Sequence, residues 1–143
     1  MRKYPNSAEA LYFRGNVHFQ AKEYKAALES YKTALQIKPE ISDFMLAQAI
    51  CENKLMKYKT ALDLLNKILK KDSLNLNAFL GRSESYDGLK LYDNAKSDIA
   101  KYLMYYPDNL DAQYLKANID AGSGDYLSAI SNFGKLIKIN PAK

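Results

Sequence analysis

The chain repeats the same pattern of residue types every 34 residues, from one end to the other. A tyrosine recurs at this interval, an alanine follows each tyrosine after three residues, and small, bulky apolar and proline positions keep the same phase. These positions hold Tyr24, Tyr58, Tyr92 and Tyr126; Ala27, Ala61, Ala95 and Ala129; Gly15, Ala49, Ser83 and Ala117; Tyr31, Leu65, Ile99 and Phe133; and Pro39, Pro107 and Pro141. Such a period is typical of repeats of two helices joined by a turn, and each repeat buries its apolar face only by stacking on its neighbours.

The period predicts eight helices and no strands, because apolar residues recur at helical spacing and no segment alternates apolar with polar residues. The predicted helices are 8–21, 24–37, 42–55, 58–71, 76–89, 92–105, 110–122 and 126–139. Small residues in both helices of a pair permit close packing. Each proline follows a second helix, which it cannot continue because it lacks an N–H. The expected N-caps of the first helices are Asn6-Ser7, Ser42, Asn75 and Asp108-Asn109.

In order and spacing, these positions resemble the tetratricopeptide repeat. The resembling repeats are 8–41, 42–75, 76–109 and 110–143, which leaves residues 1–7 as a leader or the remnant of a preceding repeat. Repeats two and four depart most from the family pattern, and Ser73 stands where a proline is expected. The resemblance implies an all-α fold, a right-handed superhelical solenoid of four repeats in one continuous array. First helices would line its concave face and second helices its convex face.

Residues able to carry catalysis or bind a metal are sparse. His18 and Cys51 are the only histidine and cysteine and lie in different repeats, whereas a metal site or a nucleophile–base pair needs several convergent groups. The glycine-containing segment 122–125 lacks both the lysine and the preceding strand of a phosphate-binding loop, so a turn between helices is favoured. The sequence therefore predicts no enzyme, no cofactor and no metal site.

The net charge of +5 is unevenly distributed. The first-helix segments hold seven acidic and four basic residues, so the lysines concentrate on the second helices and loops. A solvated basic face is the simpler interpretation. Binding of nucleic acid or an anionic surface through the convex lysines is the alternative, disfavoured because acidic residues are interleaved among them. The sequence has no signal peptide and no apolar stretch long enough for a membrane helix, so we expect no membrane insertion and a cytoplasmic location.

The face that the resemblance assigns to the concave groove is acidic and carries asparagines and aromatic rings. Its candidate peptide-binding residues are Glu9, Tyr12, Asn16, Phe19, Asp43, Leu46, Ile50, Asn53, Asn77, Leu80, Glu84, Asp87, Asp111, Tyr114 and Asn118. Asparagine amides both donate and accept hydrogen bonds and so can hold a peptide backbone. The aromatic residues Tyr12, Phe19 and Tyr114 are not expected to be needed for packing within a repeat, which leaves them to anchor a partner.

These features predict a non-catalytic protein–protein interaction scaffold. Its groove would bind an extended or helical peptide segment that is neutral to basic and partly apolar. The non-catalytic repeat region of a larger enzyme is a further alternative.

One subfamily of tetratricopeptide-repeat proteins binds the acidic C-termini of heat-shock chaperones through a clamp of cations and asparagines. The clamp positions hold Tyr12, Asn16, Ala47, Asn77 and Gly81 here, and only Asn16 matches. Since the expected cations are missing and acidic residues stand nearby, an acidic tail would be repelled. We therefore expect that the chain does not bind the acidic chaperone C-terminus.

The last predicted helix is apolar nearly all round. Some of its large side chains must face the place where a further helix would sit. The chain is therefore expected to be a segment of a longer repeat protein, or to associate end to end with itself through Ile130, Phe133 and Ile137.

Overall fold

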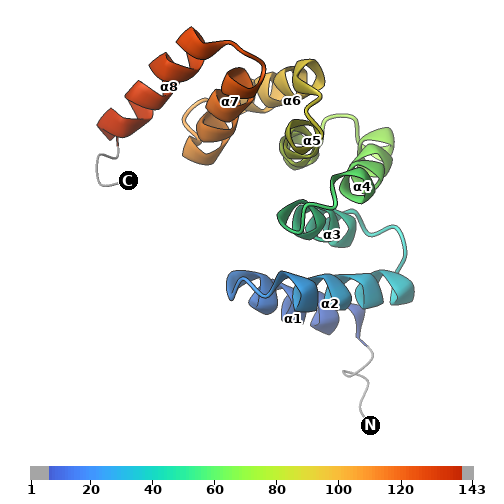
Figure 1. Cartoon of the computed structure of the whole chain (residues 1–143). Helices are drawn as coiled ribbons and strands as arrows, with labels where there is room; N and C mark the ends of the chain where they lie inside the picture. Colours follow the sequence, from blue (N-terminus) through green and yellow to red (C-terminus); the bar gives the residue numbers. More distant parts are fainter. Residues whose placement is uncertain (1–6, 140–143) are drawn as a thin grey trace. The chain divides into compact units, whose positions relative to one another are not determined.

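The structure, a computed structural model, describes residues 7–139. These residues form eight α-helices and no strand (Figure 1). The helices are α1 (Ala8–Gln20), α2 (Tyr24–Ile37), α3 (Ser42–Lys54), α4 (Tyr58–Lys71), α5 (Leu76–Gly88), α6 (Tyr92–Tyr105), α7 (Leu110–Gly122) and α8 (Tyr126–Ile139). The predicted helices are confirmed, and only the ends of α1, α3 and α5 differ, by one residue each. Pro141 and all of the predicted leader except Ser7 lie outside the described residues.

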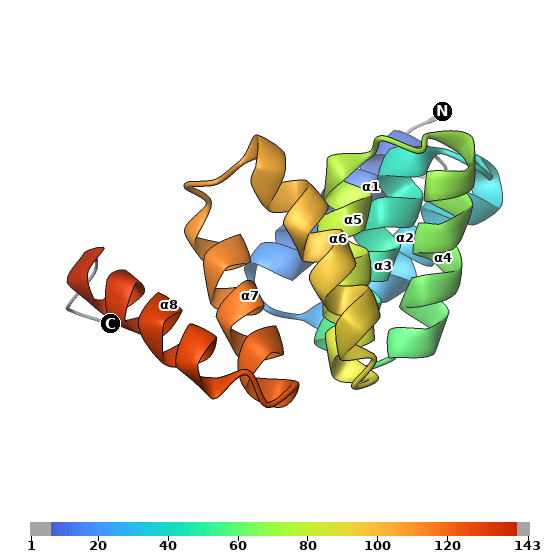
Figure 2. The same ribbon diagram turned by 90° about the horizontal axis from the view of Figure 1, so that it is seen from above.

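Consecutive helices pack as antiparallel pairs, one pair for each repeat (Figure 2). The chain divides into two compact units, Met1–Ser73 and Leu74–Lys143, which we call unit 1 and unit 2. The described helices of unit 1 are α1–α4, and those of unit 2 are α5–α8. Within unit 1, α3 packs on α2, and within unit 2, α7 packs on α6 and also contacts α5. In each unit, the first helix of the later repeat therefore covers the second helix of the earlier one.

The small positions of the repeat lie in the core, as predicted. The repeated alanines of the second helices, Ala27, Ala61, Ala95 and Ala129, are all buried. An added Cβ at Gly15 would lie 2.6 Å from Cε1 of Tyr31, so a larger residue would clash with the Tyr31 ring as it is placed. The bulky position is buried as Tyr31, Leu65 and Ile99, whereas Phe133 is only half-buried.

Side-chain caps begin three of the four first helices. Ser7, Asn75 and Asn109 each accept a hydrogen bond from the N–H of the third helical residue, at 3.1, 3.0 and 2.9 Å. The prediction that Ser42 caps α3 is wrong, because Ile41 occupies the cap position without a side-chain hydrogen bond. Position 41 is the equivalent of 7, 75 and 109 in the repeat. The helix therefore begins at the position that the repeat spacing predicts, although the isoleucine side chain offers no hydrogen-bond acceptor.

The turns inside the helix pairs share one backbone conformation. A residue with positive φ recurs at the repeat period, as Lys22 (63°), Met56 (61°), Lys90 (62°) and Gly124 (92°). In the last turn, the N–H of Asp125 donates to the carbonyl of Asp120 at 2.8 Å, which closes the end of α7. Segment 122–125 is thus the turn between helices that the sequence predicts.

Candidate functional site

The predicted groove aromatics of unit 1 are used in packing. Tyr12 stacks on Phe44 with ring centroids 4.8 Å apart, and its ring also lies 5.9 Å from that of Tyr31. Phe19 meets the ring of Tyr24 edge-on at 5.1 Å. Both side chains pack against the hydrophobic clusters of the unit. The expectation that these rings are not needed for packing is therefore wrong, because Tyr12 joins α1 to α2 and α3.

Several predicted polar residues of unit 1 are also engaged within the fold. Asn16 accepts a hydrogen bond of 2.7 Å from the hydroxyl of Tyr31. Glu9 accepts one of 2.6 Å from Nζ of Lys38, and this bond lowers the pKa of the carboxyl group. Asn53 is buried and has an interaction partner within the chain. The remaining predicted residues here are the half-buried Leu46 and Ile50 and the exposed Asp43.

The candidate peptide-binding residues of unit 2 lie on α5 and α7, two helices that contact each other. We call these residues the α5/α7 face. It consists of the exposed Asn77, Asp111 and Asn118 and the half-buried Leu80, Glu84, Asp87 and Tyr114. The ring of Tyr114 lies 6.3 Å from that of Phe133 in α8, and Leu80 packs against the core. The face therefore combines three carboxylates, two amides and an aromatic ring.

Asp87 is the distinctive carboxylate of this face. Partial burial alone raises its pKa above the ordinary value of 3.8. No cation among residues 7–139 forms an ion pair with it, whereas the buried Asp98 and Asp120 pair with cations at 2.7 and 2.8 Å. A partly desolvated carboxylate without a counterion gains stability from a positively charged ligand group.

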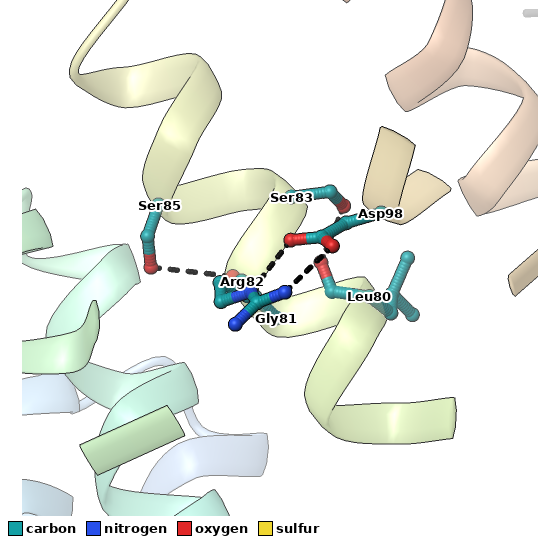
Figure 3. A network of polar contacts seen from close by, with 6 residues as sticks. All are labelled: Leu80, Gly81, Arg82, Ser83, Ser85 and Asp98. Carbon is teal, nitrogen blue, oxygen red and sulfur yellow. Dashed lines mark hydrogen bonds and ion pairs between the residues drawn. The ribbon is translucent and has the colours of Figure 1, made fainter. Parts of the chain in front are cut away.

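A partly buried ion pair in unit 2 was not predicted from the sequence (Figure 3). Arg82 of α5 donates to Asp98 of α6 through two bonds, from Nε to Oδ2 at 2.7 Å and from Nη2 to Oδ1 at 2.9 Å. This pairing raises the pKa of Arg82. The guanidinium also lies over the rings of Phe79 and Tyr86, 5.7 and 5.6 Å from their centroids. The other bonds drawn run from the hydroxyls of Ser83 and Ser85 to the carbonyls of Leu80 and Gly81. The pair joins the two helices of repeat three.

Glu52 and Asp120 are buried carboxylates at equivalent positions of repeats two and four. Asp120 accepts hydrogen bonds from Nζ of Lys116 at 2.8 Å and from the hydroxyl of Ser128 at 2.9 Å. Glu52 accepts one from Nε2 of Gln48 at 3.1 Å, and its Oε1 has no hydrogen-bond partner in the described part of the chain. Burial raises the pKa of Glu52, although the bond from Gln48 opposes that shift. Its ionised form is therefore a source of instability.

We predict that Glu52→Gln stabilises unit 1 at neutral pH by about 1–2 kcal/mol, because it removes a buried charge that is incompletely hydrogen-bonded. The folded-state pKa lies above the ordinary 4.5, so the folded chain holds this proton more tightly than the unfolded chain. The stability that the protonated Glu52 contributes is consequently fully present below pH 4.5, the ordinary pKa. It is lost as the pH rises through the folded-state pKa. Urea denaturation followed by circular dichroism should show the gain of the variant growing across that window.

Asp120→Asn is the matched control, since it removes an ion pair instead of an isolated charge. It should destabilise the chain at neutral pH. Two results would contradict the assignment of Glu52 as a destabilising buried charge. One is a stability gain of Glu52→Gln that shrinks with rising pH, and the other is an effect of the same sign for both variants.

The lone histidine and cysteine both contact other groups within unit 1. Nδ1 of His18 lies 2.8 Å from Oε1 of Glu23. The thiol of Cys51 is buried and donates to the carbonyl of Tyr24 at 2.9 Å, and burial raises its pKa to about 11. Within residues 7–139, no group of three or more His, Cys, Asp or Glu side chains is arranged to hold a metal ion. None of the helices described there is long and apolar enough to cross a membrane.

Comparison with known families agrees with the helix pairs and their period. Two tetratricopeptide repeat profiles match, one over residues 8–41 and the other over residues 110–143. The chain belongs to the tetratricopeptide-repeat family. Repeats of this family form protein–protein interaction scaffolds, and they bind protein or peptide partners.

Solved structures confirm the predicted fold class, an all-α superhelical solenoid. MamA from Desulfovibrio magneticus RS-1 superimposes with a TM-score of 0.79 at 18% identity, over 96% of this chain and 78% of MamA. YrrB, described as a TPR protein with an unusual peptide-binding site, gives a TM-score of 0.74 at 25% identity, over 96% of this chain and 71% of YrrB. The curated peptidyl-prolyl cis-trans isomerase FKBP4 of Rattus norvegicus is 30% identical over 115 residues, which cover 70% of this chain. The match spans only 25% of the length of that relative.

Proposed function

We propose that the α5/α7 face binds a basic, partly apolar peptide segment of a partner protein, and that the chain has no catalytic role of its own. The observation that carries this proposal is Asp87, a half-buried carboxylate whose pKa is raised and which pairs with no cation among the described residues. A lysine or arginine of the partner would supply the missing counterion. Asp111 adds a second, exposed negative charge to the same face.

The rest of the face suits the remainder of a peptide. Asn77 and Asn118 are exposed and offer amides that can pair with a peptide backbone whatever its side chains are. Tyr114 keeps part of its ring accessible and suits an apolar side chain of the peptide. YrrB, a protein of the same fold, has an unusual peptide-binding site. A peptide ligand is therefore in keeping with the fold and with the chemistry of the face.

The same charges disfavour an acidic chaperone tail. The clamp positions Asn77 and Gly81 on α5 carry no cation, and Glu84 and Asp87 stand on the same helix. In unit 1, the one matching clamp residue, Asn16, already accepts a bond from Tyr31. We expect a synthetic acidic C-terminal peptide to show no saturable binding at physiological salt, because its carboxylates would meet like charges.

A phage-displayed peptide selection on the whole chain tests the proposal directly. Selected peptides should be enriched in lysine or arginine next to apolar residues. For the best of them, measured by fluorescence anisotropy, Asp87→Asn and Tyr114→Ala should each weaken binding about tenfold or more, the loss typical of an interface residue at a hot spot. Both side chains are half-buried but lie outside the buried core, so the thermal midpoint should change little.

Asp125→Asn is the control variant, because Asp125 is an exposed carboxylate in the α7–α8 turn and not a member of the face. It should leave the affinity unchanged. Selected peptides that are predominantly acidic would overturn the proposal. So would peptides whose affinity survives both Asp87→Asn and Tyr114→Ala.

A hollow in unit 1 favours the alternative of an anionic ligand. It has a volume of about 430 Å³ and lies between the α2–α3 loop and α4. Its lining residues are Leu35, Pro39, Glu40, Met45, Leu64, Lys67, Lys70 and Lys71. Lys71 donates to the carbonyl of Glu40 at 3.2 Å, while Lys67 and Lys70 extend the basic rim. An apolar floor with a basic rim suits a nucleic-acid or other anionic surface as the second candidate ligand.

Anisotropy titrations with labelled RNA and DNA at low salt discriminate this alternative. Binding through the rim should weaken steeply as salt rises, because phosphate contacts release condensed counterions. Lys67→Ala with Lys70→Ala should abolish it, and Asp87→Asn should not. Absence of binding at low salt would end this alternative.

A further inference from the structure

Each unit has a surface hollow at the same place in its pair of repeats. The unit 1 hollow, of about 430 Å³, lies between the α2–α3 loop and α4. The unit 2 hollow has a volume of about 290 Å³ and is lined by residues of α6, the α6–α7 loop, α7 and α8. Six of its lining residues are the repeat equivalents of residues that line the unit 1 hollow: Leu103, Pro107, Gln113, Asn132, Lys135 and Ile139. The repeat therefore builds the hollow, and the residues that differ decide what each copy can hold.

The floors of the two hollows differ in polarity. In unit 1, the floor consists of three apolar side chains that are buried or half-buried, Leu35, Met45 and Leu64. The equivalents of Met45 and Leu64 in unit 2 are Gln113 and Asn132. Nε2 of Gln113 donates to the carbonyl of Pro107, and both residues line the unit 2 hollow, so a polar group spans part of its wall. Of the two, the unit 1 hollow is therefore the one suited to an apolar group.

The edge of the unit 1 hollow is positively charged. It is lined by Lys67, Lys70 and Lys71, together with Glu40. Nζ of Lys71 lies 3.7 Å from Oε1 of Glu40. Lys67 and Lys70 form no ion pair with any of residues 7–139. Two cations therefore stand beside the apolar floor without a counterion from the described part of the chain.

We propose that the unit 1 hollow binds a small amphipathic anion, a dissolved molecule with an apolar body and one carboxylate or phosphate head. The body would lie on Leu35, Met45 and Leu64, and the head would contact Lys67 and Lys70. The volume of about 430 Å³ lies within the range of small-molecule sites, roughly 300–1,000 Å³. Removal of the body from water drives binding, and the two lysines fix its orientation.

This ligand rests on the second candidate site of the proposed function and not on the α5/α7 face. It narrows the ligand of that site, because the phosphates of a nucleic acid would use the lysines and leave the apolar floor unused. The apolar floor is thus the observation that favours a small amphipathic anion. An alkyl carboxylate should bind where acetate does not.

NMR titration of the isotope-labelled whole chain with sodium octanoate tests the proposal. Backbone amides around the unit 1 hollow, those of Met45 and Lys67 among them, should shift and saturate. Acetate has the head without the body, and octylammonium has the body with the opposite charge, so neither should produce a saturable shift there. Each methylene added to the carboxylate should tighten binding by up to about fourfold until the hollow is filled.

Two variants separate the floor from the edge. Leu64→Asn introduces the residue that stands at the equivalent place in unit 2, so the fold should tolerate it, and octanoate should bind about tenfold more weakly. Lys67→Ala combined with Lys70→Ala should also weaken octanoate binding about tenfold, because it removes both unpaired cations. Lys135→Ala is the matched control, since it changes the equivalent of Lys67 in the unit 2 hollow, and it should leave the affinity unchanged.

Three results would overturn the proposal. One is acetate or octylammonium binding in the unit 1 hollow as tightly as octanoate. Another is an octanoate affinity that survives both Leu64→Asn and the double lysine variant, each with an unchanged thermal midpoint. The third is a chain that does not bind octanoate. RNA binding by such a chain, lost in the double lysine variant and kept in Leu64→Asn, would assign the hollow to nucleic acid, whereas the absence of both ligands would end the second candidate function as well.

Discussion

Asp98→Ala is expected to lower the free energy of unfolding of unit 2 by about 3–5 kcal/mol, the typical cost of removing one partner of a buried ion pair. Asp98 is only 2% exposed and accepts two hydrogen bonds from Arg82. Without the carboxylate, the guanidinium would remain over the rings of Phe79 and Tyr86 and would lose both of these hydrogen bonds. Urea denaturation followed by circular dichroism measures the loss.

The double variant with Arg82→Met and Asp98→Leu is the matched control. Replacing both charges by apolar groups of similar size is often neutral, so most of the lost stability should return. A loss below about 1 kcal/mol for Asp98→Ala would show that the pair behaves like a solvated surface bridge.

Tyr31→Ala should lower the free energy of unfolding of unit 1 by about 3–5 kcal/mol, the cost of deleting a large buried aromatic side chain. The ring is buried against Gly15 and Tyr12, and its hydroxyl donates to Asn16. Burial also raises the pKa of Tyr31 to about 12, so the hydroxyl stays protonated as a donor at neutral pH. Chemical denaturation of the variant and the unmodified chain gives the difference.

Two further variants test the cause of this loss. Tyr31→Phe keeps the ring and removes only the bond to Asn16, so it should cost about 1 kcal/mol. Gly15→Leu added to Tyr31→Ala should restore part of the stability, because the side chain enters the space left by the ring. If Gly15→Leu makes the Tyr31→Ala variant worse, the contact between these two positions is not what limits stability.

The repeat period predicts the helices well because packing itself is periodic. Gly15 and Ala27 must be small wherever two helices meet, and the same constraint returns in every repeat. The repeat spacing fixes the start of α3 even though its N-cap is Ile41, where a residue with a side-chain acceptor would be preferred. Helix ends to within one residue, and most core positions, therefore follow from the spacing.

Which candidate residues remain available to a partner follows from the spacing much less well, because equivalent positions meet different neighbours. Tyr12 and Tyr114 are equivalent, yet Tyr12 stacks on Phe44 in the core of unit 1, whereas Tyr114 lies 6.3 Å from the ring of the half-buried Phe133. Whether the side chains of the α5/α7 face bind a partner stays a prediction.

The pair of Arg82 and Asp98 gives no periodic signal for a similar reason. The other repeats place different residues at these two positions, as Arg14 with Ser30, Gln48 with Leu64 and Lys116 with Asn132. An interaction present in one repeat alone requires coordinates to be seen.

The buried thiol of Cys51 allows local opening of unit 1 to be measured by thiol labelling. Thiol reagents attack the exposed thiolate, and this sulfur is inaccessible, bonded to the Tyr24 carbonyl and has a pKa raised to about 11. Labelling must therefore wait until α3 separates from α2, and its rate measures how often unit 1 opens under native conditions. Because the chain contains a single cysteine, the modified species would be unambiguous by mass. Moving the thiol to the equivalent buried position in unit 2, with Cys51→Ala and Ile119→Cys, would time the opening of that unit separately.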